Sequence, residues 1–102
     1  ANASRFTGDV IALIRAAPDP VQWLVLDCSS ITDVDYSAAR DLNDLIDFVH
    51  ARGAHFVLAG ADAELQQTLE NEGILALLNA DHLFHGIGSA VRAFRAEHPG
   101  SV

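Results

Sequence analysis

The sequence contains no lysine, and its six basic residues are all arginines. Fourteen acidic residues outnumber them, so the formal net charge is −8 at pH 7. A surface with this excess of negative charge repels phosphate backbones and anionic lipid, which argues against nucleic acid as a partner. An acidic surplus also serves solubility alone, and that is its default interpretation.

Cysteine is nearly absent, since Cys28 is the only one, and a lone cysteine cannot form an intrachain disulfide. The fold therefore does not depend on an oxidising compartment. No apolar run approaches the roughly 20 residues that span a bilayer, and no signal peptide opens the sequence. Half of the 102 residues are hydrophobic, which excludes a disordered chain and suits a single domain.

Catalytic and metal-binding motifs are also missing. Ser29 and Ser30 lie outside any G-x-S-x-G pattern, and the glycines of Gly86-Ile-Gly88 are not followed by a third at the nucleotide-fingerprint spacing. Two histidines, His82 and His85, are three residues apart, but side chains at that spacing do not share a face of a strand. A zinc site needs three or four convergent ligands. We therefore expect no enzymatic activity, no metal and no cofactor.

Helical and strand patterns alternate along the chain. Apolar residues at helical spacing predict helices over 4–17, over 37–51, from Asp62 to Gly73, and from Ser89 to just before Pro99. Apolar runs predict strands at 23–28 and 55–60, the first buried on both faces, and a short third strand at 82–85. Alternation with short loops predicts an α/β fold with a mostly parallel sheet. Residues 1–98 are expected to form one domain and residues 99–102 a flexible tail.

Side-chain positions follow from the same patterns. The first helix is expected to turn five residues inward: Phe6, Val10, Leu13, Ile14 and Ala17. Ser4, Asp62 and Ser89 are the expected N-caps. A sheet of only three strands leaves an open edge, so we expect one or two further strands before Ala1 in the natural protein.

Function in an open parallel sheet gathers at the carboxyl ends of the strands. Ser37 stands near the start of the helix that follows the first strand, where free amides and the helix dipole stabilise a phosphate. Asp33 and Asp35 would repel an added phosphate, and a two-state switch can use that opposition. The simpler alternative is that Ser37 or Asp35 only caps the helix.

The segment from Val25 to Ala38, VLDCSSITDVDYSA, followed by an amphipathic helix and the run ARGAHFVLAG, resembles the STAS domain. This family is named after sulfate transporters and anti-sigma factor antagonists. Its Asp-x-Ser/Thr-Gly/Ala motif is matched by Asp35-Tyr-Ser-Ala38, its strand-ending acid by Asp27, and the end of its next strand by Gly60. The opening segment from Ala1 to Phe6 is similar to the start of the first helix in the cytoplasmic domains of SulP anion transporters.

The resemblance implies a STAS-like α/β fold and a non-catalytic regulatory or assembly domain of a SulP-type anion permease, with sulfate the leading substrate. It implies a location at the cytoplasmic face of the cell membrane. Expected partners are the transmembrane domain of the same transporter, a second copy in a homodimer, and a regulatory protein or kinase. The alternative is a soluble anti-sigma factor antagonist that is switched by phosphorylation of Ser37. Tyr36 and Ala38 depart from the small residue and the glycine usual in those antagonists. A small hydrolase using Ser37 or Cys28 lacks a base at a recognisable spacing.

The resemblance further suggests weak nucleotide binding, although no clean motif supports it. The expected place is a shallow crevice between two loops, with Arg40 as the nearest cation. It would be lined by Cys28, Ser29, Ser30, Gly60, Ala61 and Asp62. A net charge of −8 argues against a strong site for GTP or ATP.

Overall fold

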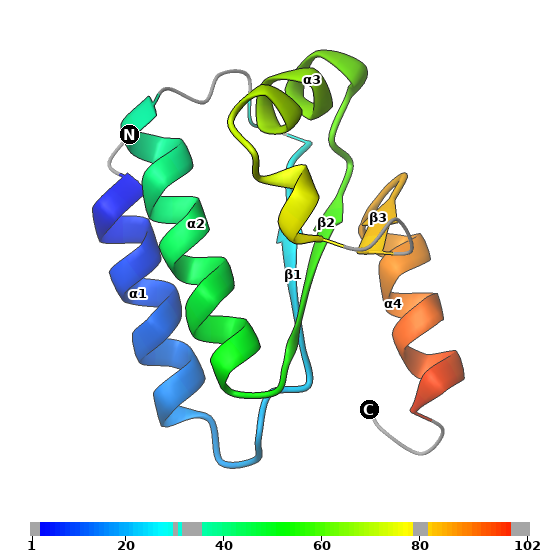
Figure 1. The fold of residues 1–102 in the computed structure, drawn as a ribbon. Helices are drawn as coiled ribbons and strands as arrows, with labels where there is room; N and C mark the ends of the chain where they lie inside the picture. Colours follow the sequence, from blue (N-terminus) through cyan, green and yellow to red (C-terminus); the bar gives the residue numbers. More distant parts are fainter. Residues whose placement is uncertain (1–2, 30, 32–35, 79–81, 99–102) are drawn as a thin grey trace.

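The computed structural model describes residues 3–29, 31, 36–78 and 82–98. Helices and strands alternate along the chain, which confirms the predicted α/β fold (Figure 1). The elements are α1 (Ala3–Ala16), β1 (Trp23–Asp27), α2 (Tyr36–Ala51), β2 (His55–Ala59), α3 (Ala63–Asn71), the 3-10 helix η1 (Leu75–Leu77), β3 (Leu83–Phe84) and α4 (Ile87–Glu97).

The sheet is parallel, and its strand order is β1-β2-β3. Trp23 to Asp27 of β1 pair with His55 to Ala59 of β2, while β3 pairs only through Leu83 and Phe84. The central strand β2 is buried from Phe56 to Ala59. The prediction that β1 is buried on both faces is wrong, because β1 lies at the edge of the sheet and its residues Trp23–Leu26 are half-buried.

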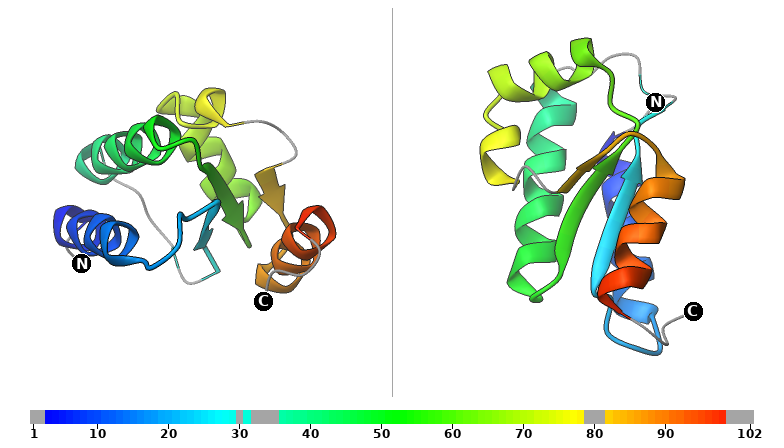
Figure 2. Two further views of the ribbon diagram at one scale, coloured as in Figure 1. Left: turned by 90° about the horizontal axis from the view of Figure 1, so that it is seen from below. Right: turned by 90° about the vertical axis from the view of Figure 1, so that its right-hand side faces the viewer.

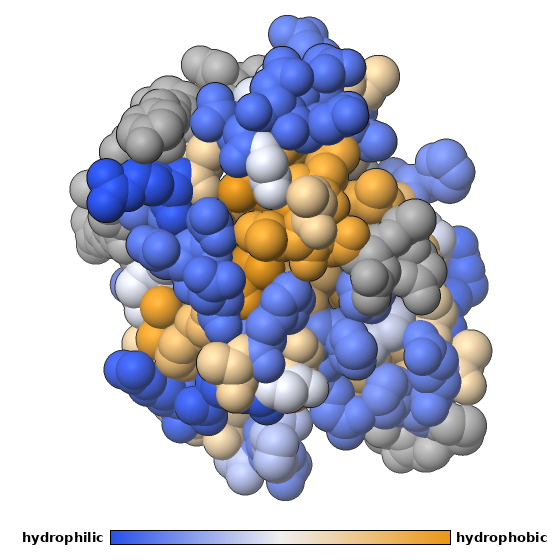
Figure 3. Space-filling view, viewed as in Figure 1, coloured by the Kyte–Doolittle hydropathy of each residue, from blue (hydrophilic) through white to orange (hydrophobic). Residues whose placement is uncertain are grey.

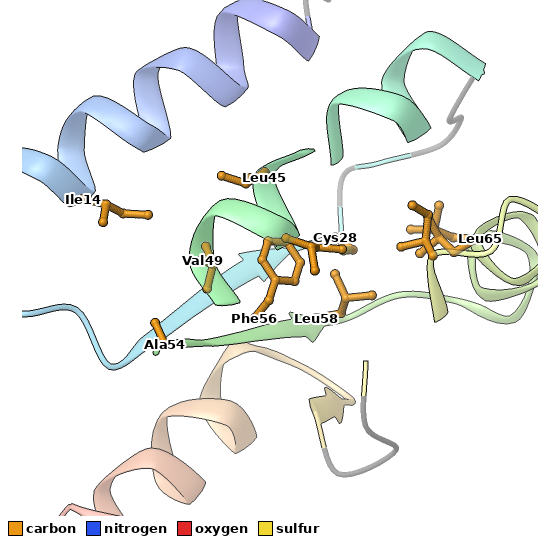
Figure 4. Packing of buried hydrophobic residues seen from close by; sticks show 11 residues of the cluster. Ile14, Cys28, Leu45, Val49, Ala54, Phe56, Leu58 and Leu65 are labelled. Carbon is orange, nitrogen blue, oxygen red and sulfur yellow. The ribbon is translucent and has the colours of Figure 1, made fainter. Parts of the chain in front are cut away.

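Helices cover both faces of the sheet. In the view from below, α1 and α2 lie on one side of the strands and α4 on the other (Figure 2). The main core joins α1, α2 and α3 to the sheet through side chains such as Ile14, Leu45, Phe56 and Leu65 (Figure 4). A smaller apolar cluster of Val57, Ala59 and Ala90 joins α4 to the opposite face.

The first helix buries less of its apolar face than its sequence pattern predicts. Ile14 is buried, but Leu13 is 71% exposed and Phe6 is 47% exposed, although both were expected to point inward. The cause is that α1 packs against α2 beside the sheet, so only the stripe that faces α2 is covered. Ser4 is not the N-cap, because α1 already begins at Ala3.

The other helix ends follow the predicted signals with one change. Gly53 and Gly73 have positive φ angles of 75° and 77° after α2 and α3, where a residue without Cβ is favoured. Helix α4 begins at Ile87, so Ser89 lies inside its first turn and Gly86 is the N-cap. The Ser89 hydroxyl accepts a hydrogen bond from the Gly86 amide at 3.3 Å and donates one to the Gly86 carbonyl at 3.0 Å. None of the described helices is both long and apolar enough to cross a membrane.

Candidate functional site

The candidate site is the rim formed where β1 and β2 end and α2 and α3 begin (Figure 1). Asp27 is the last residue of β1, and its carboxylate accepts a hydrogen bond from the Ser29 amide at 3.0 Å. Bonds from the Ser29 backbone and then the Ser29 side chain hold the pKa of Asp27 below its usual value, outweighing the opposite effect of burial. Asp27 is therefore an ionised group that fixes the first turn of the β1–α2 loop.

Cys28 belongs to the core rather than to the surface of this loop. It is 3% exposed and lies among the buried side chains around Phe56 (Figure 4). Its amide donates to the Ala59 carbonyl at 2.7 Å, which extends the pairing of β1 with β2. Burial, and after it the charge of Asp27, raises the pKa of the thiol to about 11. Such a thiol stays protonated at neutral pH, so it packs and does not act as a nucleophile.

Gly60 brings the two loops of the rim together. Its φ angle of 78° lies in the left-handed region. A Cβ at this position would lie 3.4 Å from both the Cβ and the amide nitrogen of Ser29. The Gly60 amide donates to the Phe84 carbonyl at 2.9 Å, so the end of β3 is tied to the same point. The β1–α2 and β2–α3 loops are thus so close beside Ser29 that a side chain at position 60 would reach van der Waals distance of it.

Asp62 has a structural role at the start of α3. It is the N-cap of α3, and its Oδ1 accepts a hydrogen bond from the Leu65 amide at 2.8 Å, which confirms the predicted cap. The carbonyl of Ala61 accepts a hydrogen bond from the Gln66 side-chain amide at 2.9 Å. Both loop residues are therefore held in place by the first two turns of α3.

Ser37 is the second residue of α2, so its backbone lies in the first helical turn, where amides lack intrahelical partners. Its side chain is outside what the structure describes, as are Ser30, Asp33 and Asp35. Arg40 is exposed on the next turn of the same helix. The rim thus joins Ser29, Gly60 and the start of α3, and the helix that carries Ser37 and Arg40 begins at the same end of the sheet.

Sequence reasoning missed a ring cluster at the opposite, amino ends of the strands. Trp23 begins β1, His55 begins β2 opposite it, and His82 directly precedes β3. Parallel pairing places Trp23 opposite His55, but β3 begins opposite Leu58, so the position of His82 depends on a register that the sequence pattern does not specify. Within the described part of the chain, no three His, Cys, Asp or Glu side chains converge as metal ligands.

Comparison with known proteins identifies the family. The STAS domain model matches residues 1–90. A probable sulfate transporter of Mycobacterium tuberculosis, strain H37Rv, is 32% identical over 95 residues, which cover 93% of this chain and 17% of the transporter. The chain therefore spans about a sixth of that relative.

Solved structures share the fold. The STAS domain of a SulP transporter from Vibrio cholerae superposes with a TM-score of 0.84 at 20% identity, over 95% of this chain and 76% of the other. The murine anion transporter Slc26a9 superposes with a TM-score of 0.79 at 24% identity, over 93% of this chain and 16% of the other.

Proposed function

Because this chain belongs to the STAS domain family, we propose that it is the cytoplasmic regulatory and assembly domain of a SulP-type anion permease, with sulfate the leading substrate. The observation that carries the proposal is the 32% identity over 93% of this chain with a probable sulfate transporter. Since the chain spans only 17% of that relative, transport belongs to the whole protein. The expected partner is the membrane-spanning part of the same polypeptide, with a homodimer as a further expected assembly.

The domain regulates or assembles and does not catalyse. Its one thiol is buried and protonated at neutral pH, which supports a packing role. The Asp62 carboxylate is held by the α3 cap, and Asp27 is ionised and bound to Ser29. These bonds give the carboxylates structural roles at the rim.

A transport assay tests the main proposal. The full-length protein is produced in bacteria that lack their own sulfate uptake, with and without residues 1–102. We expect labelled sulfate to accumulate with the full-length protein and uptake or membrane abundance to fall without the domain. No uptake of sulfate or another oxyanion by the full-length protein would contradict the permease assignment.

Ser37 is the proposed regulatory position, because its backbone lies in the first turn of α2. Ser37→Asp adds a negative charge there, and we expect it to keep the fold but change the transport rate of the full-length protein. Asn43→Asp is the matched control, since it adds the same charge at an exposed position further along α2. Equal rates in the two variants and the wild type would contradict a switch at Ser37.

The rim is also the proposed place for weak nucleotide binding. Ser29, Gly60 and Ala61 lie in its two neighbouring loops, and Arg40 is the proposed cation. Titration with GTP or ATP, followed by amide NMR, is expected to shift resonances of residues 29–40 and 60–62. Arg40→Gln should weaken these shifts, while Arg52→Gln, which removes a distant charge, should not. Spectra that stay unchanged at millimolar nucleotide would remove this part of the proposal.

The soluble anti-sigma factor antagonist remains the alternative function, and the coding sequence upstream of Ala1 separates the two. A series of apolar spans favours the permease, whereas a start codon shortly before the domain favours the antagonist. In the second case, phosphorylation of Ser37 by a partner kinase should release a bound protein.

A further inference from the structure

Three of the five histidines gather around Trp23, the only tryptophan of the chain, at the amino ends of the strands. The ring centroid of Trp23 lies 6.4 Å from that of His55, 6.2 Å from that of His82 and 6.3 Å from that of His98. We call this group, completed by the rings of β3 and α4, the Trp23 cluster: Trp23, His55, His82, Phe84, Phe94 and His98.

His55, which begins β2, and His82, which precedes β3, form a close pair. Their ring centroids are 5.0 Å apart. His82 is 8% exposed, while His55 is exposed at the start of β2. Because each imidazole gains a positive charge when it binds a proton, acidification places two like charges at this short separation.

No acidic side chain of the described residues forms an ion pair with either member of the pair. The charged residues of the neighbouring elements are exposed, and Arg52 places its guanidinium over the Phe48 ring. Asp81 lies outside the described residues. The charged or titratable groups of the surrounding elements are Asp19 before β1, Arg52 before β2, His85 after β3, and Arg92, Arg95, Glu97 and His98 on α4 and its end.

Strand β3 and helix α4, which meet at the pair, are attached to the sheet by few interactions. Strand β3 is paired through two residues, and α4 follows it after a two-residue turn. The apolar contact beneath α4 consists of Val57, Ala59 and Ala90 with the partly buried Trp23, Val25 and Phe84. Packing around Trp23 is therefore a large part of what attaches the unit formed by β3 and α4.

We propose that the His55–His82 pair makes the attachment of β3 and α4 to the sheet sensitive to acid. Uncharged imidazoles pack against Trp23 and against each other. When acid adds a proton to both rings, two like charges lie about 5.0 Å apart and a charge stands beside the buried face of the cluster. The unit formed by β3 and α4 then opens more readily than the rest of the domain.

His98 provides an internal contrast. It follows the last turn of α4, where a positive charge interacts favourably with the helix dipole. Its Nδ1 lies 2.9 Å from the Phe94 carbonyl, and its ring stacks on the Phe94 ring. The charged form keeps the first contact, because a protonated Nδ1 donates to the carbonyl. Protonation of His98 therefore does not oppose the attachment of α4.

Amide hydrogen exchange of the 102-residue chain at about pH 7.5 and about pH 5 tests the proposal, with intrinsic rates corrected for pH. Within one sample, amides of α2 serve as the reference for amides of α4. We expect the opening equilibrium of α4 relative to α2 to rise roughly tenfold in acid, as two unit charges at this distance predict for a partly solvated pair. The fluorescence of Trp23 should change over the same pH range.

Single replacements identify the pair as the cause. His55→Gln leaves only one charge and should remove most of the acid effect, and because His55 is exposed the variant should fold. His82→Gln should act in the same way. The acid effect on the opening of α4 should persist in His98→Gln. It should also persist in His50→Gln and His85→Gln, which change histidines outside the cluster. An acid effect of equal size in His55→Gln and the wild type, or no preferential opening of α4 in the wild type, would overturn the proposal.

Discussion

Single residues at the ends of the strands determine how closely the loops of the rim approach each other. Gly60 has a left-handed backbone, which favours glycine, and a Cβ there would lie 3.4 Å from Ser29. Cys28 fills the space behind the same loop, and its burial makes the thiol inert. Gly60 and Cys28 therefore contribute to the rim through backbone conformation and packing.

Replacement of Gly60 by alanine should destabilise the domain by roughly 1–2 kcal/mol, because an L-residue is strained at a positive φ. Urea unfolding followed by circular dichroism measures the change. Gly8→Ala is the matched control, since nothing lies within 4 Å of a Cβ there and alanine favours a helix by roughly 0.5–1 kcal/mol. Equal effects of the two replacements would contradict the role of Gly60.

Cys28 makes the free energy of unfolding depend on pH, and the sign of this dependence follows from its raised pKa. Because burial raises the pKa of its thiol from 9.0 to about 11, ionisation is easier in the unfolded chain. Stability from this group is complete below pH 9.0 and is lost as the pH rises towards 11. Urea unfolding across this range should therefore show a decline that is smaller in Cys28→Ala. The thiol should also react slowly with a disulfide reagent at pH 8 in the folded domain and rapidly in urea.

At the scale of helices and strands, α3 shows how much a local signal can determine. In the sequence, Asp62 stands before an apolar helical pattern that ends at Gly73. In the structure, the Leu65 amide donates to Asp62 at the start of α3, and Gly73 has a left-handed backbone after its end. Asp62→Ala should cost about 0.5–2 kcal/mol of unfolding free energy, measured by urea unfolding, since a helix amide loses its acceptor. Asp19→Ala, at an exposed residue outside any helix or strand, should cost little, and an equal loss would contradict the capping role.

Elements whose signals are local were predictable from the sequence, and long-range placement was not. Within the described residues, alternating patterns located the four α-helices and the three strands to within one or two residues. The face that α1 buries depends on its packing against α2, so the exposure of Leu13 was not contained in the periodicity. At the site, the sequence predicted only that the loops after β1 and β2 lie at the same end of the sheet, and the closeness of Ser29 to Gly60 comes from the structure. The gathering of histidines around Trp23 depends on strand register, which no single segment specifies.

For the whole molecule, the sheet has an asymmetry between its two edges. Strand β1 is longer than β3, and in the described residues nothing pairs with its outer edge. That edge is apolar and lacks the lysines, prolines or bulges that usually protect exposed strands. Helix α1, whose Phe6 and Leu13 are exposed, lies on the β1 side of the sheet rather than on the β3 side (Figure 2). Apolar side chains also gather on the face of the domain shown in Figure 3, within a largely hydrophilic surface.

The open edge of β1 predicts that a further strand pairs with it in the natural protein. The Cys28 amide donates to the Ala59 carbonyl, so it faces β2. Because the amides of a strand alternate in direction, the amides of Leu24 and Leu26 also face β2. The amides of Trp23, Val25 and Asp27 face outward. In the 102-residue chain, the outward amides should exchange with solvent faster than the inward pair. In a chain extended upstream of Ala1, the outward amides should become protected while the inward pair stays unchanged. Fast exchange of the outward amides in both chains would contradict the prediction, because it would show that no further strand pairs with β1.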